Sequence, residues 1–426
     1  MKVKNVMTRT ISGILVLFFV LNLSSCYFFK AMKYKKYPLE KLDEFAAVRF
    51  HPSEQPFRFK QSSLSPALKN ELDSLLIGSN RYAMLVIRND SILYEFYNYK
   101  IADTTLLPSF SVAKSYVSTM IAMALEEGKI KSLNDPISNY LPELLKRDSR
   151  FSNITIQHVL DMRSGIKSSE NYFNPMSDVL RLGFGKNVNG KSLRIYIEKE
   201  PNQFFEYKSI NTQLLGMIVE RSTGMKLQDY FVEKIQKPLQ FEHPSTWIYD
   251  DAKHKTLRAF CCMNLTARDY AKFGRLILNK GNWQGKQLVN EKWVETILSL
   301  ENRKATDGYK NQWWSNISHK IFNDSIGMQK FVLNNPAVYD IDKISMANVL
   351  INYKFSKPYD KIENEKKSWL VSYYKDGIHA QGLIGQYIYI SPKKNSIVVI
   401  LSNTLNPDLP LKNGGLGRIE KLLESE

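Results

Sequence analysis

Cysteine is scarce in this sequence. Only three of the 426 residues are Cys: Cys26 and the neighbours Cys261 and Cys262. So few cysteines exclude a disulfide-stapled scaffold. No Cys-x-x-Cys occurs and the six His are scattered, so we expect neither a metal site nor a cofactor. Because neighbouring cysteines close only a strained ring, the adjacent pair is expected to be two buried thiols.

The apolar run near the start is too short to span a bilayer. Lys2, Lys4 and Arg9 precede an almost unbroken apolar stretch from Ile11 to Leu23, followed by Ser-Ser-Cys26. A membrane-spanning helix needs about 20 apolar residues, so this pattern is typical of an export signal. The small residues before Cys26 resemble a bacterial lipobox. We therefore predict a lipoprotein signal peptide over residues 1–25 and lipidation of Cys26. A plain secretory signal or a short membrane anchor is the alternative.

Sequence signatures of nucleic-acid binding are missing too. The formal net charge is +17, from 59 basic and 42 acidic residues. There is no zinc-finger spacing, no Arg-rich helix and no strand signature that mixes aromatic and basic residues. Lysines 30, 33, 35, 36 and 41 follow the predicted anchor, where basic residues lie close to anionic lipid head groups. We expect a membrane-proximal protein that binds no nucleic acid.

The remaining composition is that of an ordinary globular protein. Hydrophobic residues make up 43% of the chain and charged residues 24%, which excludes fibrous and wholly disordered classes. Residues 26–70 contain four prolines among polar residues and are predicted to be a lipid-anchored tether. Residues 71–426 are predicted to form one domain. No internal repeat is visible, and residues 318–367 have little periodicity.

Strand patterns occur at both ends of this domain. Residues 82–87 and 91–97 predict a hairpin, and so do residues 386–390 and 396–402. The segment between them, from about 129 to 280, has mostly helical periodicity. This order predicts an α/β fold of the α+β type: an antiparallel sheet built from both chain ends, flanked by helices, with a mostly helical lobe inserted. The cleft between the lobes is the expected ligand site.

One Ser-x-x-Lys motif stands out by its context. The pattern occurs four times, but only Ser111 opens a long apolar helix after a loop and a strand hairpin. Positions i and i+3 share one helix face, so Lys114 lies within reach of the Ser111 hydroxyl. A lysine acts as a base only when neutral, and at pH 7 an ordinary lysine is neutral in about one molecule in 2,500. Burial among apolar neighbours lowers its pKa. The alternative is a helix N-cap followed by a surface lysine.

Several further sequence blocks, in order along the chain, indicate what this motif does. With them the sequence resembles the serine β-lactamase and penicillin-binding superfamily, in its class C-like branch, over about residues 80–405. The blocks are Ser109–Leu141, Ile154–Ile166, Phe205–Gly216 and Thr266–Leu276. The resemblance implies a β-lactamase/transpeptidase-like fold.

The resemblance assigns roles to the Phe205–Gly216 block. It implies that Tyr207 shares proton transfer with Lys114; a core tyrosine is the alternative. Where the family usually has Tyr-x-Asn, this chain has Tyr207-Lys208-Ser209, so Ser209 takes the place of an amide-binding Asn. The departure weakens the case for β-lactam or peptide recognition.

The last motif also departs from the family pattern. Aligned on the Gly of the usual Lys/His-Thr/Ser-Gly, the chain reads Ala380-Gln381-Gly382-Leu383. At the position where the family has the cation that grips the substrate, this chain then has Ala380. His379 lies one residue before it. On a strand that offset points to the opposite face unless a bulge intervenes. The resemblance further implies an oxyanion hole made by the backbone N–H groups of Ser111 and Leu383, with His379, Gln381 and Gly382 as substrate-binding candidates.

These departures are similar to those of the nylon-oligomer (aminohexanoate-dimer) hydrolases and related esterases. In that branch a tyrosine in the loop after Ser-Gly closes over the substrate, which makes Tyr172 the candidate here, with plain packing as the alternative. The adjacent tryptophans 313 and 314 are expected near a strand facing the cleft. We take Trp313 as a substrate-binding candidate, although such pairs are as often core and rim.

Together these patterns predict a monomeric, lipid-anchored, periplasm-facing serine hydrolase. Ser111 attacks an ester or amide of a small molecule or peptide, and Lys114 and Tyr207 transfer protons. One alternative keeps the chemistry but acts on cell-wall D-alanyl peptides or β-lactams. Another is a catalytically inactive envelope binding module, which predicts the loss of one of the three catalytic residue types.

Overall fold

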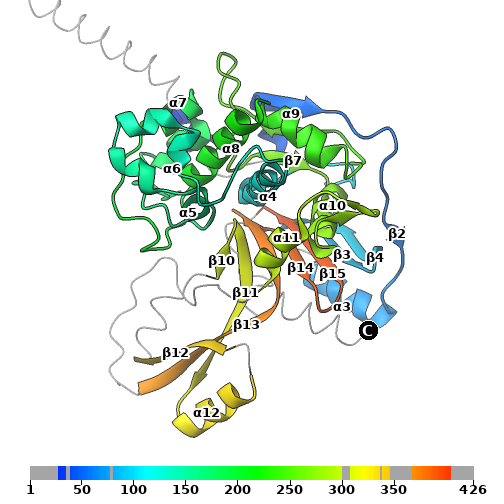
Figure 1. The fold of residues 1–426 in the computed structure, drawn as a ribbon. Helices are drawn as coiled ribbons and strands as arrows, with labels where there is room; N and C mark the ends of the chain where they lie inside the picture. The colour runs from blue at the N-terminus through cyan, green and yellow to red at the C-terminus, as the bar shows by residue number, and fades with distance from the viewer. Residues whose placement is uncertain are drawn as a thin grey trace, which may run out of the picture.

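The computed structural model describes residues 27–34, 39–76, 80–299, 308–335, 338–345 and 367–403. Figure 1 shows a twisted sheet with helices packed against it and a lobe of short helices at one end. No helix within these residues is both long and apolar enough to cross a bilayer. The predicted signal peptide and Cys26 lie outside the described residues.

The central sheet joins strands from both ends of the domain. In the described part of the chain it has nine strands in the order β10-β11-β13-β14-β15-β3-β4-β2, with β12 beside β13. The pairs are antiparallel except β2 with β4. This arrangement confirms the predicted fold class. The strands are β2 (Lys60–Gln61), β3 (Arg81–Arg88), β4 (Ser91–Tyr97), β10 (Tyr309–Lys310), β11 (Trp313–Phe322), β12 (Val338–Ser345), β13 (Lys367–Gly382), β14 (Gln386–Ser391) and β15 (Ser396–Ser402).

Both predicted hairpins are present. The turn between β3 and β4 is Asn89-Asp90, and both residues have positive φ, 49° and 60°. Asn and Asp tolerate this left-handed conformation, which suits a two-residue hairpin turn. Strand β15 then pairs with β3 residue by residue, Val398 opposite Val86. The last described strand is therefore hydrogen-bonded to the first strand of the domain.

Helices cover both faces of the sheet, which explains why its strands are apolar throughout. On β15, Ile397 and Val399 belong to the core shared with α4 (Ala113–Glu126) and α10 (Ala267–Leu278). Val398 and Ile400 belong to a second core shared with α3 (Pro66–Leu76). The sheet is thus the middle of three layers.

The helical lobe matches the prediction except at its end. It contains short helices and a small sheet in the order β1-β6-β7-β5, whereas α10 packs on β14 and β15 and belongs to the sheet layers. The elements not yet given are α5 (Ile156–Leu160), α6 (Asp178–Phe184), α7 (Val188–Ser192), α8 (Ser209–Thr223), α9 (Leu227–Phe231), α11 (Glu291–Leu298), β1 (Ala47–Phe50), β5 (Leu107–Pro108), β6 (Ser245–Ile248), β7 (Met263–Leu265), β8 (Asn282–Trp283), β9 (Lys286–Gln287), η1 (Leu39–Glu44), η2 (Phe110–Val112), η3 (Ile137–Asn139), η4 (Pro142–Lys146), η5 (Ser149–Asn153) and η6 (Val232–Gln236).

The segment predicted as a tether is folded against the domain in its described parts. Helix α2 (Tyr27–Lys33) packs on α6, and β1 pairs with β6 of the helical lobe. The Tyr34 ring stacks on Phe184 of α6 with centroids 6.4 Å apart. The tether prediction is therefore wrong for the described parts of this segment. The prediction rested on its prolines and polar residues, but its apolar side chains are buried against the domain.

Strands β11 and β13 extend beyond the sheet and carry α12 (Ser325–Leu333) and β12, which Figure 1 shows on the side away from the helical lobe. At the root of this extension, the two adjacent tryptophans point to opposite faces. Trp313 is fully buried and stacks on Phe273 of α10 with centroids 5.7 Å apart. Its expected role in substrate binding is wrong, because it is a core residue. Trp314 instead contacts Tyr207.

The Trp313→Ala variant should lose about 3–5 kcal/mol of unfolding free energy, because it leaves a large cavity between the sheet and α10. Urea denaturation followed by circular dichroism measures this loss. Trp314→Ala is the matched control and should cost less, because Trp314 is only half-buried. Equal losses in the two variants would contradict the assignment of Trp313 to the core.

Candidate active site

The Ser111 turn is held in place by a neighbouring strand. Ser109 donates its backbone N–H to the carbonyl of Met263 at 2.7 Å, and its hydroxyl accepts from the Met263 N–H at 3.1 Å. Phe110 then has φ +43°, a left-handed conformation that costs energy for a bulky residue and recurs at functional sites. Ser111 follows in η2, the single turn that leads directly into α4. The prediction that Ser111 stands at a helix start is confirmed.

Lys114 lies buried one helical turn after the serine. Its Nζ is 2.9 Å from Ser111 Oγ and donates a second hydrogen bond to the Phe260 carbonyl, also 2.9 Å long. The side chain is only 1% exposed, and this burial lowers the pKa of Lys114 to about 8. Burial disfavours the ammonium form, so about a tenth of the amine is neutral at pH 7, far more than for an ordinary lysine. The alternative of a surface lysine is wrong.

Tyr207, which lies just before α8, is the third residue of the group formed with Ser111 and Lys114. The Lys114 ammonium lies 5.1 Å from the centroid of its ring. Burial raises the pKa of Tyr207, and a hydrogen bond between the Tyr207 and Ser111 hydroxyls opposes that rise. On its other side the ring stacks on Trp314, 5.7 Å between centroids. The structure therefore brings all three residues predicted to be catalytic together.

Glu170 is a residue of this site that the sequence reasoning missed. Its carboxylate accepts hydrogen bonds from the Ser209 backbone N–H at 2.8 Å, from the Ser209 hydroxyl at 2.5 Å and from the Tyr172 hydroxyl at 2.7 Å. Its charge also raises the pKa values of Lys114 and Tyr207. The signal that could have found it is the Ser at position 209: a hydroxyl in place of the family's Asn leaves room for an acid partner.

Gly382 brings the end of β13 against the Ser111 turn. A Cβ atom built on this glycine would lie 2.4 Å from the carbonyl oxygen of Ser109, closer than real contacts allow. Only glycine permits this approach. Leu383 follows and shares a pocket with Ser111. This placement agrees with the expected oxyanion hole, which the backbone N–H groups of Ser111 and Leu383 would form together.

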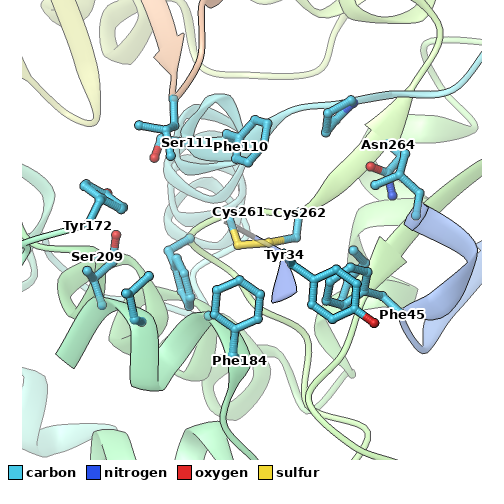
Figure 2. Close-up of a pocket in the computed structure, with 18 residues that line it drawn as sticks. Tyr34, Phe45, Phe110, Ser111, Tyr172, Phe184, Ser209, Cys261, Cys262 and Asn264 are labelled. Atoms are coloured by element: carbon cyan, nitrogen blue, oxygen red, sulfur yellow. A yellow bond between two sulfur atoms is a disulfide. The ribbon is translucent and has the colours of Figure 1, made fainter. Parts of the chain in front are cut away.

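A largely apolar pocket opens beside Ser111. Figure 2 shows Ser111, Tyr172 and Ser209 on one side of it, Tyr34 and Phe45 on the other, and a disulfide between them. Its empty space, including the part open to solvent, is about 860 Å³. Tyr172 and Ser209, both predicted as substrate-binding residues, are thus pocket-lining residues.

Two other predicted contacts are not brought to the pocket. His379 pairs with Trp314 across the sheet, without a bulge between β13 and β14 at that point, and its ring contacts Tyr387 at 5.9 Å between centroids. It therefore lies beside Trp314 on the same face of the sheet, and it is not among the residues that line the pocket. Gln381 is exposed and donates its amide to the Tyr387 hydroxyl at 3.1 Å.

Cys261 and Cys262 form a disulfide. The expectation of two buried thiols is therefore wrong. Cys262 has φ +72°, so the chain turns in a left-handed conformation at the pair. The two residues follow Phe260, whose carbonyl accepts from Lys114, and both line the pocket. The sulfur atoms thus form part of the pocket floor.

Within the described residues, one group has the geometry of a metal site: Asp250, Asp251 and His254. Its carboxylates already accept backbone N–H groups, Val188 at 2.9 Å and Asn187 at 3.1 Å, which begin α7. His254 Nδ1 contacts the Asp251 carboxylate at 2.9 Å. These contacts give the group a structural role.

Comparison with known proteins agrees with this geometry. A family model described as Beta-lactamase matches residues 82–417. A 6-aminohexanoate-dimer hydrolase from Paenarthrobacter ureafaciens is 28% identical over 255 residues, which cover 54% of this chain and 63% of that protein. Protein flp from Staphylococcus aureus strain MW2 is 28% identical over 177 residues, 38% of this chain and 34% of that one. The chain thus matches under two thirds of the length of these curated relatives.

Solved structures show the same fold. A candidate 6-aminohexanoate-dimer hydrolase from Bacillus anthracis superposes with a TM-score of 0.63 at 19% identity, covering 92% of both chains. A class C β-lactamase from Rhodobacter sphaeroides superposes with a TM-score of 0.53 at 20% identity, covering 85% of this chain and 99% of that chain. At these identities the likeness establishes the architecture alone.

The reactivity of Ser111 should follow the titration of Lys114. We expect the rate of covalent labelling by a small fluorophosphonate to rise with pH and to reach half of its plateau at about pH 8, the pKa of Lys114. Glu170 raises that pKa, so Glu170→Gln should lower it further and move the curve to lower pH.

Glu206→Gln is the matched control for this prediction. Glu206 lies nearby but pairs with Lys199 at 2.8 Å and Lys208 at 3.0 Å, so the labelling curve should keep its position. A Glu170→Gln curve that stays in place, or moves to higher pH, would contradict the electrostatic role given to Glu170.

Proposed function

The chain belongs to the Beta-lactamase family and is a hydrolase of the β-lactamase fold, and from this premise we propose that it cleaves an ester or amide through an acyl-enzyme on Ser111. The observation that carries the proposal is the contact of 2.9 Å between Ser111 Oγ and the buried Lys114 Nζ. A hydroxyl next to a base of lowered pKa is the arrangement that makes serine nucleophilic.

In the proposed acylation step, Ser111 Oγ attacks the substrate carbonyl carbon and its proton passes to neutral Lys114. The carbonyl oxygen becomes an oxyanion, which the N–H groups of Ser111 and Leu383 stabilise. The bond to the leaving group then breaks, and the proton reaches the departing oxygen or nitrogen through Tyr207. Water next attacks the acyl-enzyme, gives a proton back along the same residues to Ser111 Oγ, and releases the acid.

The raised pKa of Tyr207 fits the part of a proton relay. Its phenol stays protonated through the neutral range, so it donates to the leaving group while Lys114 replaces the proton. The two groups differ in the direction of their shifts because burial disfavours the charged form of each, ammonium in one and phenolate in the other. In the molecules whose Lys114 is neutral, Tyr207 still carries the proton that the leaving group needs.

The runner-up substrates, β-lactams and D-alanyl peptides, have less support. The family cation position is Ala380, which is fully buried in the core, and the Ser209 hydroxyl is bonded to Glu170 rather than free for a substrate amide. A carboxylated substrate would thus lack two of its usual partners. An inactive binding module has less support still, because Ser111, Lys114 and Tyr207 lie together.

We place the enzyme in the cell envelope as a proposal. The lipobox-like sequence ending in Cys26 supports a lipid anchor and a periplasmic position, and α2 begins at the next residue. The lysines after Cys26 would add attraction to anionic lipids.

Ser111→Ala should lower the turnover rate of p-nitrophenyl butyrate at least 10³-fold, because the acyl-enzyme no longer forms. The assay follows nitrophenolate release by the chain from residue 27 and by the variant, with thermal unfolding as the control for folding. Equal rates in the two proteins would overturn the assignment of Ser111 as nucleophile.

Gly382→Ala should lower kcat about 100-fold, because the new methyl group pushes β13 away from Ser109 and with it the Leu383 N–H. The neighbouring variant Gln381→Ala removes an exposed side chain that bonds Tyr387 outside the pocket, and it should retain the rate. Full activity of Gly382→Ala in the same butyrate assay would exclude Leu383 from the oxyanion hole.

A further inference from the structure

The described lining of the pocket beside Ser111 carries no charged side chain. Among the described residues that line it there is no Lys, Arg, His, Asp or Glu. Its walls are aromatic and aliphatic side chains, including Phe110, Phe184 and Val179. Such a surface favours an apolar ligand and penalises a charged one, which would lose its hydration without gaining a partner.

Most polar side-chain groups on the lining are already hydrogen-bonded within the protein. The hydroxyls of Tyr172 and Ser209 both donate to Glu170, at 2.7 Å and 2.5 Å. The Asn264 amide nitrogen donates to the Thr246 hydroxyl at 2.8 Å, which leaves its Oδ1 atom as a buried oxygen without a hydrogen-bond partner among the described residues. Few hydrogen-bonding groups remain for a polar substituent, so the pocket selects by shape and apolar area.

The pocket lies on the acyl side of the reacting bond. Ser111 and Leu383, the two residues of the proposed oxyanion hole, both line it, whereas Tyr207 does not line it in the described structure. Tyr207 delivers the proton to the leaving group, so the leaving group lies beside Tyr207. The part of the substrate that stays on Ser111 therefore extends into the pocket.

The N-terminal segment forms the far wall. Tyr34, Leu42 and Phe45 line the pocket opposite Ser111, as Figure 2 shows for Tyr34 and Phe45. This wall is fastened by Glu44, which accepts from Lys33 at 2.5 Å and also from the Tyr34 hydroxyl. The disulfide of Cys261 and Cys262 lies between the two walls and adds an apolar, polarisable floor.

We propose that this pocket binds the acyl group of the substrate, and that this group is an uncharged, apolar chain of medium length. The proposal rests on the proposed function, because it takes Ser111 as the atom that carries the acyl group. It separates this enzyme from a hydrolase whose substrate has a charged acyl end.

The first test is a series of p-nitrophenyl esters from acetate to octanoate. Each added methylene should raise kcat/KM about two- to fourfold until the pocket is full. The p-nitrophenyl ester of 6-aminohexanoate, which ends in an ammonium group, should react at least tenfold more slowly than the heptanoate, its uncharged counterpart of equal length. A flat or falling series, or equal rates for the charged and uncharged esters, would overturn the proposal.

Gly183 offers a variant that fills the pocket. It lines the cavity from α6, and a Cβ atom added there would meet no other atom within 4 Å. Gly183→Leu should lower the ratio of octanoate to acetate kcat/KM at least tenfold. Lys186→Leu is the matched control, because it adds the same side chain at an exposed position just after α6 and should keep the ratio. An unchanged ratio in Gly183→Leu would count against the pocket.

A binding measurement separates this proposal from the proposed function. Calorimetry with the Ser111→Ala variant needs no turnover, and it should show octanamide binding at least tenfold more tightly than 6-aminohexanamide. Adding Gly183→Leu should weaken octanamide. If Ser111 of the native chain fails to react with the fluorophosphonate while octanamide binds as expected, the proposed function fails and the apolar pocket stands. If Ser111 reacts and octanamide does not bind, the pocket assignment fails alone.

Discussion

The burial of Lys114 is the constraint on which the rest of the site depends. An ordinary lysine is charged at neutral pH and cannot take a proton from a serine. Here the amine is enclosed by α4 and by the Phe260 carbonyl, with its side chain 1% exposed, and its pKa falls to about 8. The Ser111 turn, the Met263 strand and the start of α8 all pack around it. Their positions therefore set the contact of 2.9 Å between the Ser111 hydroxyl and the Lys114 amine.

Glu170 limits how far burial lowers the pKa of Lys114. Its negative charge raises the pKa of Lys114 and so opposes the desolvation that lowers it. The same carboxylate holds the Ser209 backbone N–H at the start of α8, where a negative charge is favoured by the helix dipole. Replacing the family's Asn by Ser209 and pairing it with an acid thus exchanges an amide-binding group for an internal hydrogen bond. Under the proposed function, this change would move substrate recognition from polar contacts toward the apolar pocket.

Much of the scaffold could be predicted from local patterns. The two hairpins follow from alternating apolar runs and turn residues, and α4 follows from apolar spacing after Ser111, because these features depend on neighbours in the sequence. Glu170 could not be predicted this way: its partners Ser209 and Tyr172 meet it only after folding. Trp313 and Trp314 look alike in sequence, and only the orientation of β11 decides which of them reaches Tyr207. The Cys261–Cys262 disulfide was missed because the left-handed turn at Cys262 has no signature in its residue type.

The N-terminal segment connects the proposed lipid anchor with the proposed acyl pocket, two features that are separate in the sequence. Its polar composition indicated a spacer between a lipid anchor and the enzyme, yet α2 packs on α6 and Tyr34 reaches the pocket. Helix α2 has seven residues, a length of about 10 Å at 1.5 Å per residue. An anchor at Cys26 would therefore hold the apolar wall of the pocket close to the lipid surface. Apolar acyl substrates concentrate at such a surface, so the same short helix would bring the enzyme to its substrate and help to bind it.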